Sequence, residues 1–153
     1  MASVQFDISL PAIQNAIQGS KAIVRLQNPA PLYKAWANYL EELATNAYKN
    51  ETAPFGSGWP KLKEAAQRVP NRRGILRVFN ELYTSTVAQV LPDGAQIGSN
   101  LAVGKYSLLA IHQYGAPRAN IPARRVLPLD AQGNLLPQVE DECFALTEDY
   151  ILG

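Results

Sequence analysis

The search for catalytic chemistry starts from the single cysteine, Cys143, and the single histidine, His112. A thiol beside an imidazole can act as an activated nucleophile. Cys143, however, falls on the apolar face of a predicted helix, where a small buried thiol is the ordinary outcome. One cysteine and one histidine also leave little for a zinc site. The pair therefore predicts neither a catalytic nor a metal site.

Three consecutive carboxylates, Glu140, Asp141 and Glu142, are the other candidates for acid–base or metal chemistry. Consecutive helix positions point in different directions, so these side chains do not converge. They suit a helical first turn, where negative charge is favourable. Residues 56–58 and 98–100 are rich in glycine and serine but lack the lysine spacing of a phosphate-binding loop. We expect no catalytic residue, no metal and no cofactor, and hence no enzyme.

Paired arginines offer a different chemistry. Arg72 and Arg73 are adjacent, as are Arg124 and Arg125, with Arg118 nearby. Guanidinium groups bind phosphate or carboxylate, but they also lie in solvated loops or pair with a neighbouring chain. The solvated loop is the favoured interpretation for the first pair. For the second group we favour a protein–protein contact, with Arg124 forming an ion pair between subunits.

Two aromatic residues lie in a predicted loop, residues 52–60, whose two prolines and two glycines leave no regular period. Phe55 and Trp59 are either tucked beneath this loop or kept for a partner, and the tucked arrangement is favoured. The residues predicted to contact other subunits or partners are Phe55, Trp59, Arg118, Ile121, Pro122, Arg124 and Arg125.

Composition narrows the class of protein. A chain of 153 residues predicts one domain, residues 1–153. Its formal net charge of +1 predicts no bulk attraction to nucleic acid or to acidic membranes. No apolar run approaches the ~18 residues that cross a bilayer, and the first residues do not resemble a secretory signal. A single cysteine fits a reducing compartment, so we expect a protein that acts in, or is assembled in, the cytoplasm, with no membrane partner.

Hydrophobic periodicity predicts the elements that position these residues. Residues 1–8 are expected to be an extended arm. Helices are expected over residues 10–26, 32–49, 61–68, 74–86, 105–114 and 137–152. In the helix over 74–86, one face is expected to carry Ile75, Leu76, Phe79 and Leu82.

A hairpin is predicted between these helices. Residues 84–91 and 95–98 have strand character, and the turn between them, Pro92–Gly94, combines a fixed φ with a glycine. Residues 116–130 are expected to form a long loop rich in proline and arginine. The fold class is therefore α+β: N-terminal helices, a small central antiparallel sheet with this long loop, and a C-terminal helix.

Five short motifs follow one another in a characteristic order. They are Trp59–Leu62, Leu82–Ser85, Ile97–Asn100, Ile111–Gly115 and Ile121–Arg124. In order and spacing they resemble the phage virion morphogenesis family, which includes tail-completion proteins of P2-like phages and gpG-like proteins of Mu. The resemblance covers about residues 32–152. Within it, His112, Gln113 and Gly115 are expected to form a structural turn.

The sequence departs from the family pattern at several positions. The glycine that the family has before the Leu-x-x-Ser motif is Asn80 or Glu81 here. After the Ile-Pro-Ala-Arg motif, the proline and aromatic residue of the family are Arg125 and Val126. The glycine after the next leucine is Pro128. These last three changes fall in the loop that is expected to touch neighbouring subunits.

The resemblance implies a structural virion protein at the head–tail junction, assembled in the host cytoplasm. Such a protein completes or terminates the tail as a ring of identical subunits, six being expected and twelve an alternative on the connector side. Its partners would be tail tube or sheath proteins and neck proteins. The alternatives are a head-completion, connector or capsid-assembly factor, and a neck protein whose arginines face DNA in the lumen. A peptidoglycan-cleaving enzyme is disfavoured, because it would need two placed carboxylates.

Overall fold

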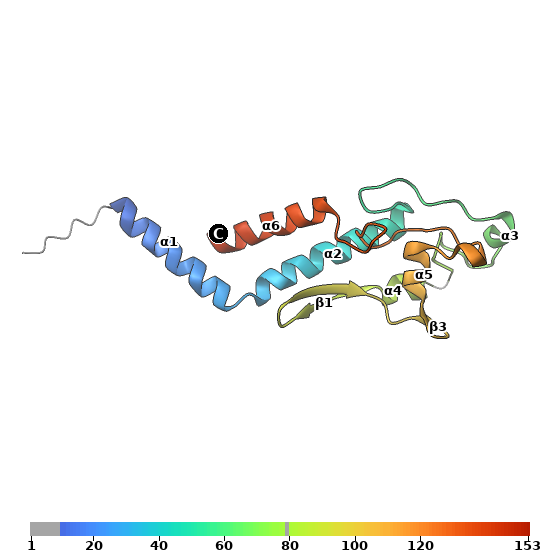
Figure 1. Ribbon diagram of the computed structural model, residues 1–153, viewed down its shortest axis with the longest axis horizontal. Helices are drawn as coiled ribbons and strands as arrows, with labels where there is room; N and C mark the ends of the chain where they lie inside the picture. Colours follow the sequence, from blue (N-terminus) through green and yellow to red (C-terminus); the bar gives the residue numbers. More distant parts are fainter. Residues whose placement is uncertain (1–9, 79) are drawn as a thin grey trace, which may run out of the picture.

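A computed structural model describes residues 10–78 and 80–153 (Figure 1). The expected arm at residues 1–8 lies outside the described residues, as does Phe79. Helix α1 spans Leu10–Gln27 and continues through Gly19, and α2 spans Ala30–Asn50. The chain bends between them at Pro29, and Pro31 occupies the first turn of α2, where no backbone N–H is needed. Both predicted N-terminal helices are confirmed.

Helix α2 lies at the centre of the fold because two of its sides pack against other parts of the chain. One side buries Ala44, Ala47 and Tyr48 in the core. Trp36, on the other side, donates from Nε1 to the carbonyl of Cys143 in the C-terminal helix at 3.3 Å. The hydroxyl of Tyr48 lies 2.9 Å from Oγ1 of Thr86, and burial raises the pKa of this tyrosine to about 12. The helix ends where Glu51 adopts a left-handed conformation with φ of 53°.

The predicted hairpin is confirmed, with β1 at Val87–Leu91 and β2 at Gly94–Gly98. Their antiparallel register pairs Val87 with Gly98 and Leu91 with Gly94, so the turn is Pro92-Asp93. A second hairpin is separate from the first, with β3 at Ala102–Val103 and β4 at Tyr106–Ser107. The expected central sheet is thus two small antiparallel sheets.

The predicted helix over residues 74–86 is wrong for its first half. Only Glu81–Ser85 is helical, as α4. Leu76 and Asn80 both have positive φ, which a right-handed helix cannot contain. The carboxylate of Glu51 also accepts a hydrogen bond from the backbone N–H of Ile75 at 2.7 Å, which holds this segment against the end of α2.

The remaining helices are α3 at Glu64–Gln67, α5 at Leu108–Tyr114 and α6 at Pro137–Leu152. Helix α5 is shorter than predicted because Tyr106 and Ser107 belong to β4, and Ser107 caps the helix by accepting from the N–H of Ala110. The predicted long loop is confirmed over residues 116–130; it contains a 3₁₀ turn, Pro117–Ala119, and an isolated β-bridge between Ala116 and Ile121.

Figure 1 shows an elongated molecule, with α6 lying along α2 and reaching α1, and with α3 and α5 at the opposite end. The contact between α1 and α6 includes Tyr150, whose hydroxyl donates to the carbonyl of Arg25 at 3.2 Å. Arg25 donates from Nη1 to the carbonyl of Ile151 at 3.1 Å. The α+β class with a C-terminal helix is confirmed.

Candidate functional site

Gln113, on α5, is the centre of a hydrogen-bonded arrangement with the following loop. Its side chain is 1% exposed. Oε1 accepts from the backbone N–H groups of Val126 and Leu127, each at 2.8 Å, and Nε2 donates to the carbonyl of Leu127 at 3.0 Å. A glutamine can satisfy two donors and one acceptor in this way, because it carries both an oxygen and an amide nitrogen. Gln113 therefore fastens the second half of the long loop to α5.

Gly115 makes the turn out of α5, with φ of 78° and ψ of 170°. A Cβ atom here would lie 2.8 Å from the backbone nitrogen of Ala123 and 3.0 Å from the carbonyl oxygen of Ile121. The loop crosses so closely because Ala116 and Ile121 exchange two backbone hydrogen bonds, at 2.8 and 3.1 Å. Only glycine fits both the conformation and the space.

Arg124 is 6% exposed, and its contacts lie within the chain. Nε donates to the carbonyl of Pro60 at 3.0 Å, and Nη2 donates to the carbonyl of Lys61 at 3.4 Å. Its own backbone N–H donates to the carbonyl of His112 at 2.7 Å. Burial, followed by the charge of Arg72, lowers the pKa of the guanidinium. An ion pair between subunits remains a prediction for Arg124, in addition to this internal bridging.

His112 lies against Arg124 and is part of the same cluster. Its Nδ1 atom is buried and has no hydrogen-bond partner among the described residues. Burial and then the positive charge of Arg124 lower the pKa of the imidazole from its ordinary value of 6.5. The ring is therefore neutral at neutral pH, which suits a packed turn residue.

The two aromatic residues of the 52–60 loop lie differently. Trp59 is buried, packs edge-on against Tyr48 with ring centroids 6.0 Å apart, and donates from Nε1 to the carbonyl of Arg125 at 2.9 Å. Phe55 is 53% exposed and has a φ of 55°. Trp59 is thus tucked and Phe55 is not, so Phe55 is the aromatic residue of this loop that a partner could reach.

The seven predicted contact residues fall into groups by exposure. Phe55, Arg118 and Pro122 are exposed, Ile121 and Arg125 are half-buried, and Trp59 and Arg124 are buried. Their contacts with other subunits remain predictions. What the structure brings together is Trp59, Arg124 and Arg125, whose hydrogen bonds join residues 59–61 to residues 124–125.

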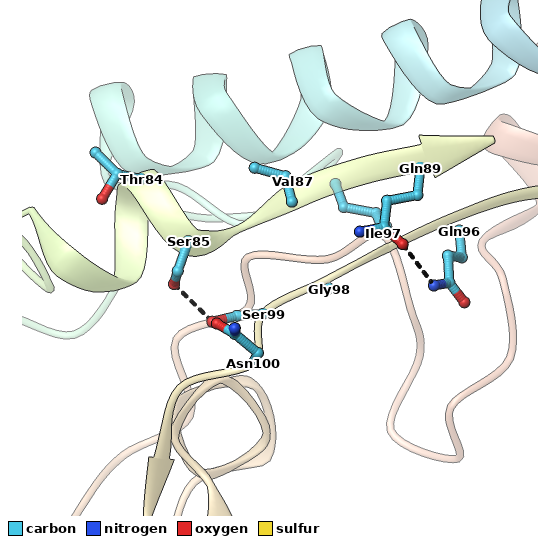
Figure 2. A pocket seen from close by; sticks show the side chains of 9 residues that line it. All are labelled: Thr84, Ser85, Val87, Gln89, Gln96, Ile97, Gly98, Ser99 and Asn100. Carbon is cyan, nitrogen blue, oxygen red and sulfur yellow. Dashed lines mark hydrogen bonds between the residues drawn. The ribbon is translucent and has the colours of Figure 1, made fainter.

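A second polar contact joins two more of the sequence motifs (Figure 2). Ser85, at the end of α4, lies 2.6 Å from Ser99, oxygen to oxygen, and Ser99 also accepts from the N–H of Leu101 at 3.2 Å. Both serines line an open hollow beside β1 and β2, together with Asn100. The sequence shows both serines within motifs, but only the chain reversal at the hairpin brings them into contact.

Asn80 is one of the two positions, with Glu81, that stand where the family pattern has glycine. It has a φ of 57°, the left-handed region that glycine enters most easily. Asparagine is the non-glycine residue that tolerates this region best. Its Oδ1 also accepts from Nε of Arg77 at 3.1 Å, which helps to hold the conformation. The backbone conformation at Asn80 is therefore one that favours glycine or asparagine.

The arrangement offers binding and packing rather than a reactive group. In the described part of the chain, no three His, Cys, Asp or Glu side chains are grouped to hold a metal ion. Burial and then the charge of Glu142 raise the pKa of the Cys143 thiol, which disfavours the thiolate. His112 and Cys143 lie on α5 and α6, which Figure 1 shows apart. Among the residues described, no helix is long and apolar enough to cross a membrane.

The structure is an α+β subunit in which motif residues tie the chain's own loops together. The chain is a member of the phage virion morphogenesis family, whose model matches residues 8–141. The match begins before the motifs and includes all of α1. Searches among curated proteins and among solved structures gave no significant match. The chain is therefore a virion protein with a role in phage morphogenesis.

Proposed function

We propose that this protein completes the phage tail, forming a ring that ends the tail and joins it to the neck. Membership of the phage virion morphogenesis family is the observation that carries this proposal. The role is structural rather than enzymatic, because the family is one of virion morphogenesis and the buried side chains of Gln113 and Arg124 hold loops of the subunit itself. Its partners would be further copies of the chain, tail tube or sheath proteins, and neck proteins.

The shape and surface of the subunit support ring formation. Large apolar side chains remain exposed on α1, on the hairpin and on α6, among them Ile23, Val90 and Phe144. Each two-stranded sheet also has edges that no further strand covers among the described residues. Exposed apolar groups and open strand edges are surfaces that assemblies use. A ring needs two different surfaces on each subunit, which an elongated subunit can offer at its two ends.

Electron microscopy of a lysate tests this proposal. The phage carries an early stop codon in its copy of this gene, and the control is the same phage supplied with the intact gene from a plasmid. Tail completion predicts full heads beside separate tails, especially tails of irregular length. Empty or malformed heads beside normal free tails would overturn it and favour head completion or capsid assembly instead.

A further inference from the structure

Charge is divided unevenly along this nearly neutral chain. Residues 61–125 contain ten of the fourteen Lys and Arg residues and three acidic residues, a net charge of +7. Residues 126–153 contain six acidic residues and no basic residue, a net charge of −6. Residues 1–60 contain four of each sign and are neutral. The overall charge of +1 therefore conceals one strongly basic and one strongly acidic region.

These two regions do not neutralise each other within the subunit. In the described part of the chain, one ion pair is formed, between Arg68 and Glu64 at 3.8 Å, and it lies within the basic region. Figure 1 shows why: the acidic helix α6 lies along α2 toward α1, whereas α3 and α5 lie at the other end. The acidic charges of α6 therefore face solvent or a partner.

The outer face of α6 combines these acidic residues with apolar ones. Asp141, Phe144, Glu148 and Leu152 follow one another at steps of three and four, so they share one face of the helix. Phe144 is 73% exposed and Leu152 is 70% exposed. The opposite face of the helix packs within the subunit, since Val139 on that face is completely buried. The outer face has the form of an apolar anchor flanked by negative charge.

The basic end of the molecule carries a hollow of matching character. A hollow of about 530 Å³ lies between the segment before α3 and the long loop, and Tyr114, Ile121 and Pro122 line it together with Lys63. An adjoining hollow shares Ile121, Pro122 and Lys63 and adds Lys61. Both lysines are exposed. The hollow is therefore an apolar recess with positive charge at its rim.

We propose that the outer face of α6 in one copy docks into this hollow in the next copy. Phe144 enters the recess at Ile121 and Pro122, while Asp141 and Glu148 face Lys61 and Lys63. The proposal rests on the ring function proposed above, because each subunit contributes an acidic face and a basic recess. Such a head-to-tail contact leaves both surfaces of every subunit occupied once the ring closes. Complementary charge of this kind selects the partner and speeds its encounter.

Charge exchange in the full chain tests the contact. Glu148→Lys combined with Asp141→Lys reverses the acidic face, and Lys61→Glu combined with Lys63→Glu reverses the recess. We expect each double variant to self-associate about tenfold more weakly than the unaltered chain, or worse, measured by sedimentation velocity at low salt. An equimolar mixture of the two should regain association, because every contact in an alternating assembly then pairs opposite charges.

Further variants separate the apolar and electrostatic parts of the contact. Phe144→Ser should weaken self-association about tenfold, because the anchor is lost while the charge is kept. Glu81→Lys, at an exposed position of α4 that belongs to neither surface, is the matched control and should associate normally. Added salt should weaken the unaltered assembly, since it screens exposed charges over ~10 Å at 0.1 M.

Three results would overturn this contact. They are an unaltered chain that stays monomeric at low salt up to its solubility limit, double variants that associate normally, and a mixture that does not regain association. Binding of double-stranded DNA by the monomer, abolished by Lys61→Glu with Lys63→Glu, would assign the basic end to nucleic acid instead. The lysate experiment is independent of these results. Failure of tail completion would appear in the heads and tails, whereas failure of this contact would appear in the purified protein.

Discussion

On α5 and the loop that follows it, the side chains of Gln113 and Arg124 are buried and hydrogen-bonded, whereas along α6 apolar side chains face outward. Gln113 is 1% exposed and makes three hydrogen bonds, while Phe144 is 73% exposed. The first region resembles the interior of a finished protein. The second resembles one side of an interface that is not yet formed. The comparison separates residues that fix the subunit from residues that are available to join it to others.

The same difference indicates what the residues of the sequence motifs do in the subunit. Motif residues such as Gln113, Gly115 and Arg124 hold loops within the chain, so they secure the shape of the subunit. Loops fixed in this way cost little conformational entropy when another subunit binds. The α5 region therefore provides the rigid recess, and the exposed helix provides what enters it.

The largest effect on stability is expected from Gln113→Ala. The substitution leaves the buried backbone N–H groups of Val126 and Leu127 without acceptors and opens a small cavity. We expect the free energy of unfolding to fall by about 4 kcal/mol, measured by urea denaturation. Gln138→Ala, at an exposed position of α6, is the control and should change it by less than about 0.5 kcal/mol. Equal losses for the two variants would contradict the internal role of Gln113.

Gly115→Ala is expected to have the next largest effect. The added methyl group meets backbone atoms of Ala123 and Ile121, and the required φ and ψ are almost restricted to glycine. A loss of about 3 kcal/mol is expected, again from urea denaturation. Gly94→Ala is the matched control, because a Cβ atom there has no neighbour within 4 Å. If Gly115→Ala were tolerated as well as this control, the close crossing of the loop would be wrong.

Arg124→Met tests the bridge between the long loop and residues 60–61. The substitution keeps an unbranched apolar stem but removes the guanidinium and with it the donors to the carbonyls of Pro60 and Lys61. We expect a loss of about 2 kcal/mol in the free energy of unfolding. Arg118→Met, in the exposed 3₁₀ turn, should have little effect. A variant at Arg124 that kept its stability but lost self-association would instead support the ion pair between subunits.

Much of the fold could be predicted from the sequence, because helices α1, α2 and α6 and the first hairpin depend on local periodicity and turn residues. The segment around Leu76 could not be predicted in the same way. Its apolar spacing favours a helix, but a left-handed φ at Leu76 and the hydrogen bond from Ile75 to Glu51 override that preference. Contacts between residues far apart in sequence decided the structure there.

The site shows the same division. The motif residues could be identified by type and order, and the turn at Gly115 follows from glycine itself. The hydrogen bonds of Gln113 and Arg124 could not be foreseen, because their acceptors and donors are backbone groups. Backbone N–H and carbonyl groups occur throughout the chain, so the sequence does not indicate which of them a given side chain will bind. The division of charge between residues 61–125 and 126–153 can be counted from the sequence. Only the position of α6 in the fold shows that the acidic helix lies away from the basic end.

A pH dependence is expected from His112, within the buried region. Its pKa is lower in the folded protein than in the unfolded chain, so the unfolded chain binds the proton more readily. Its contribution to stability is complete above pH 6.5 and is lost as the pH falls toward the folded pKa. His112→Gln should therefore lose less stability than the unaltered chain between about pH 7 and about pH 5, measured by urea denaturation. Parallel curves for the two proteins would argue against a neutral, buried imidazole.

The smallest effect on stability is expected from Phe144→Ser. This variant therefore tests directly whether the outer face of α6 is free of contacts within the subunit. Removing this exposed ring should change the free energy of unfolding by less than about 0.5 kcal/mol. Val139→Ala, on the buried face of the same helix, should cost about 2 kcal/mol because it leaves a cavity at a completely buried position. Thermal unfolding of the two variants side by side measures this contrast. A large loss from Phe144→Ser would mean that the ring already stabilises the subunit, and α6 would then no longer be the open side of an interface.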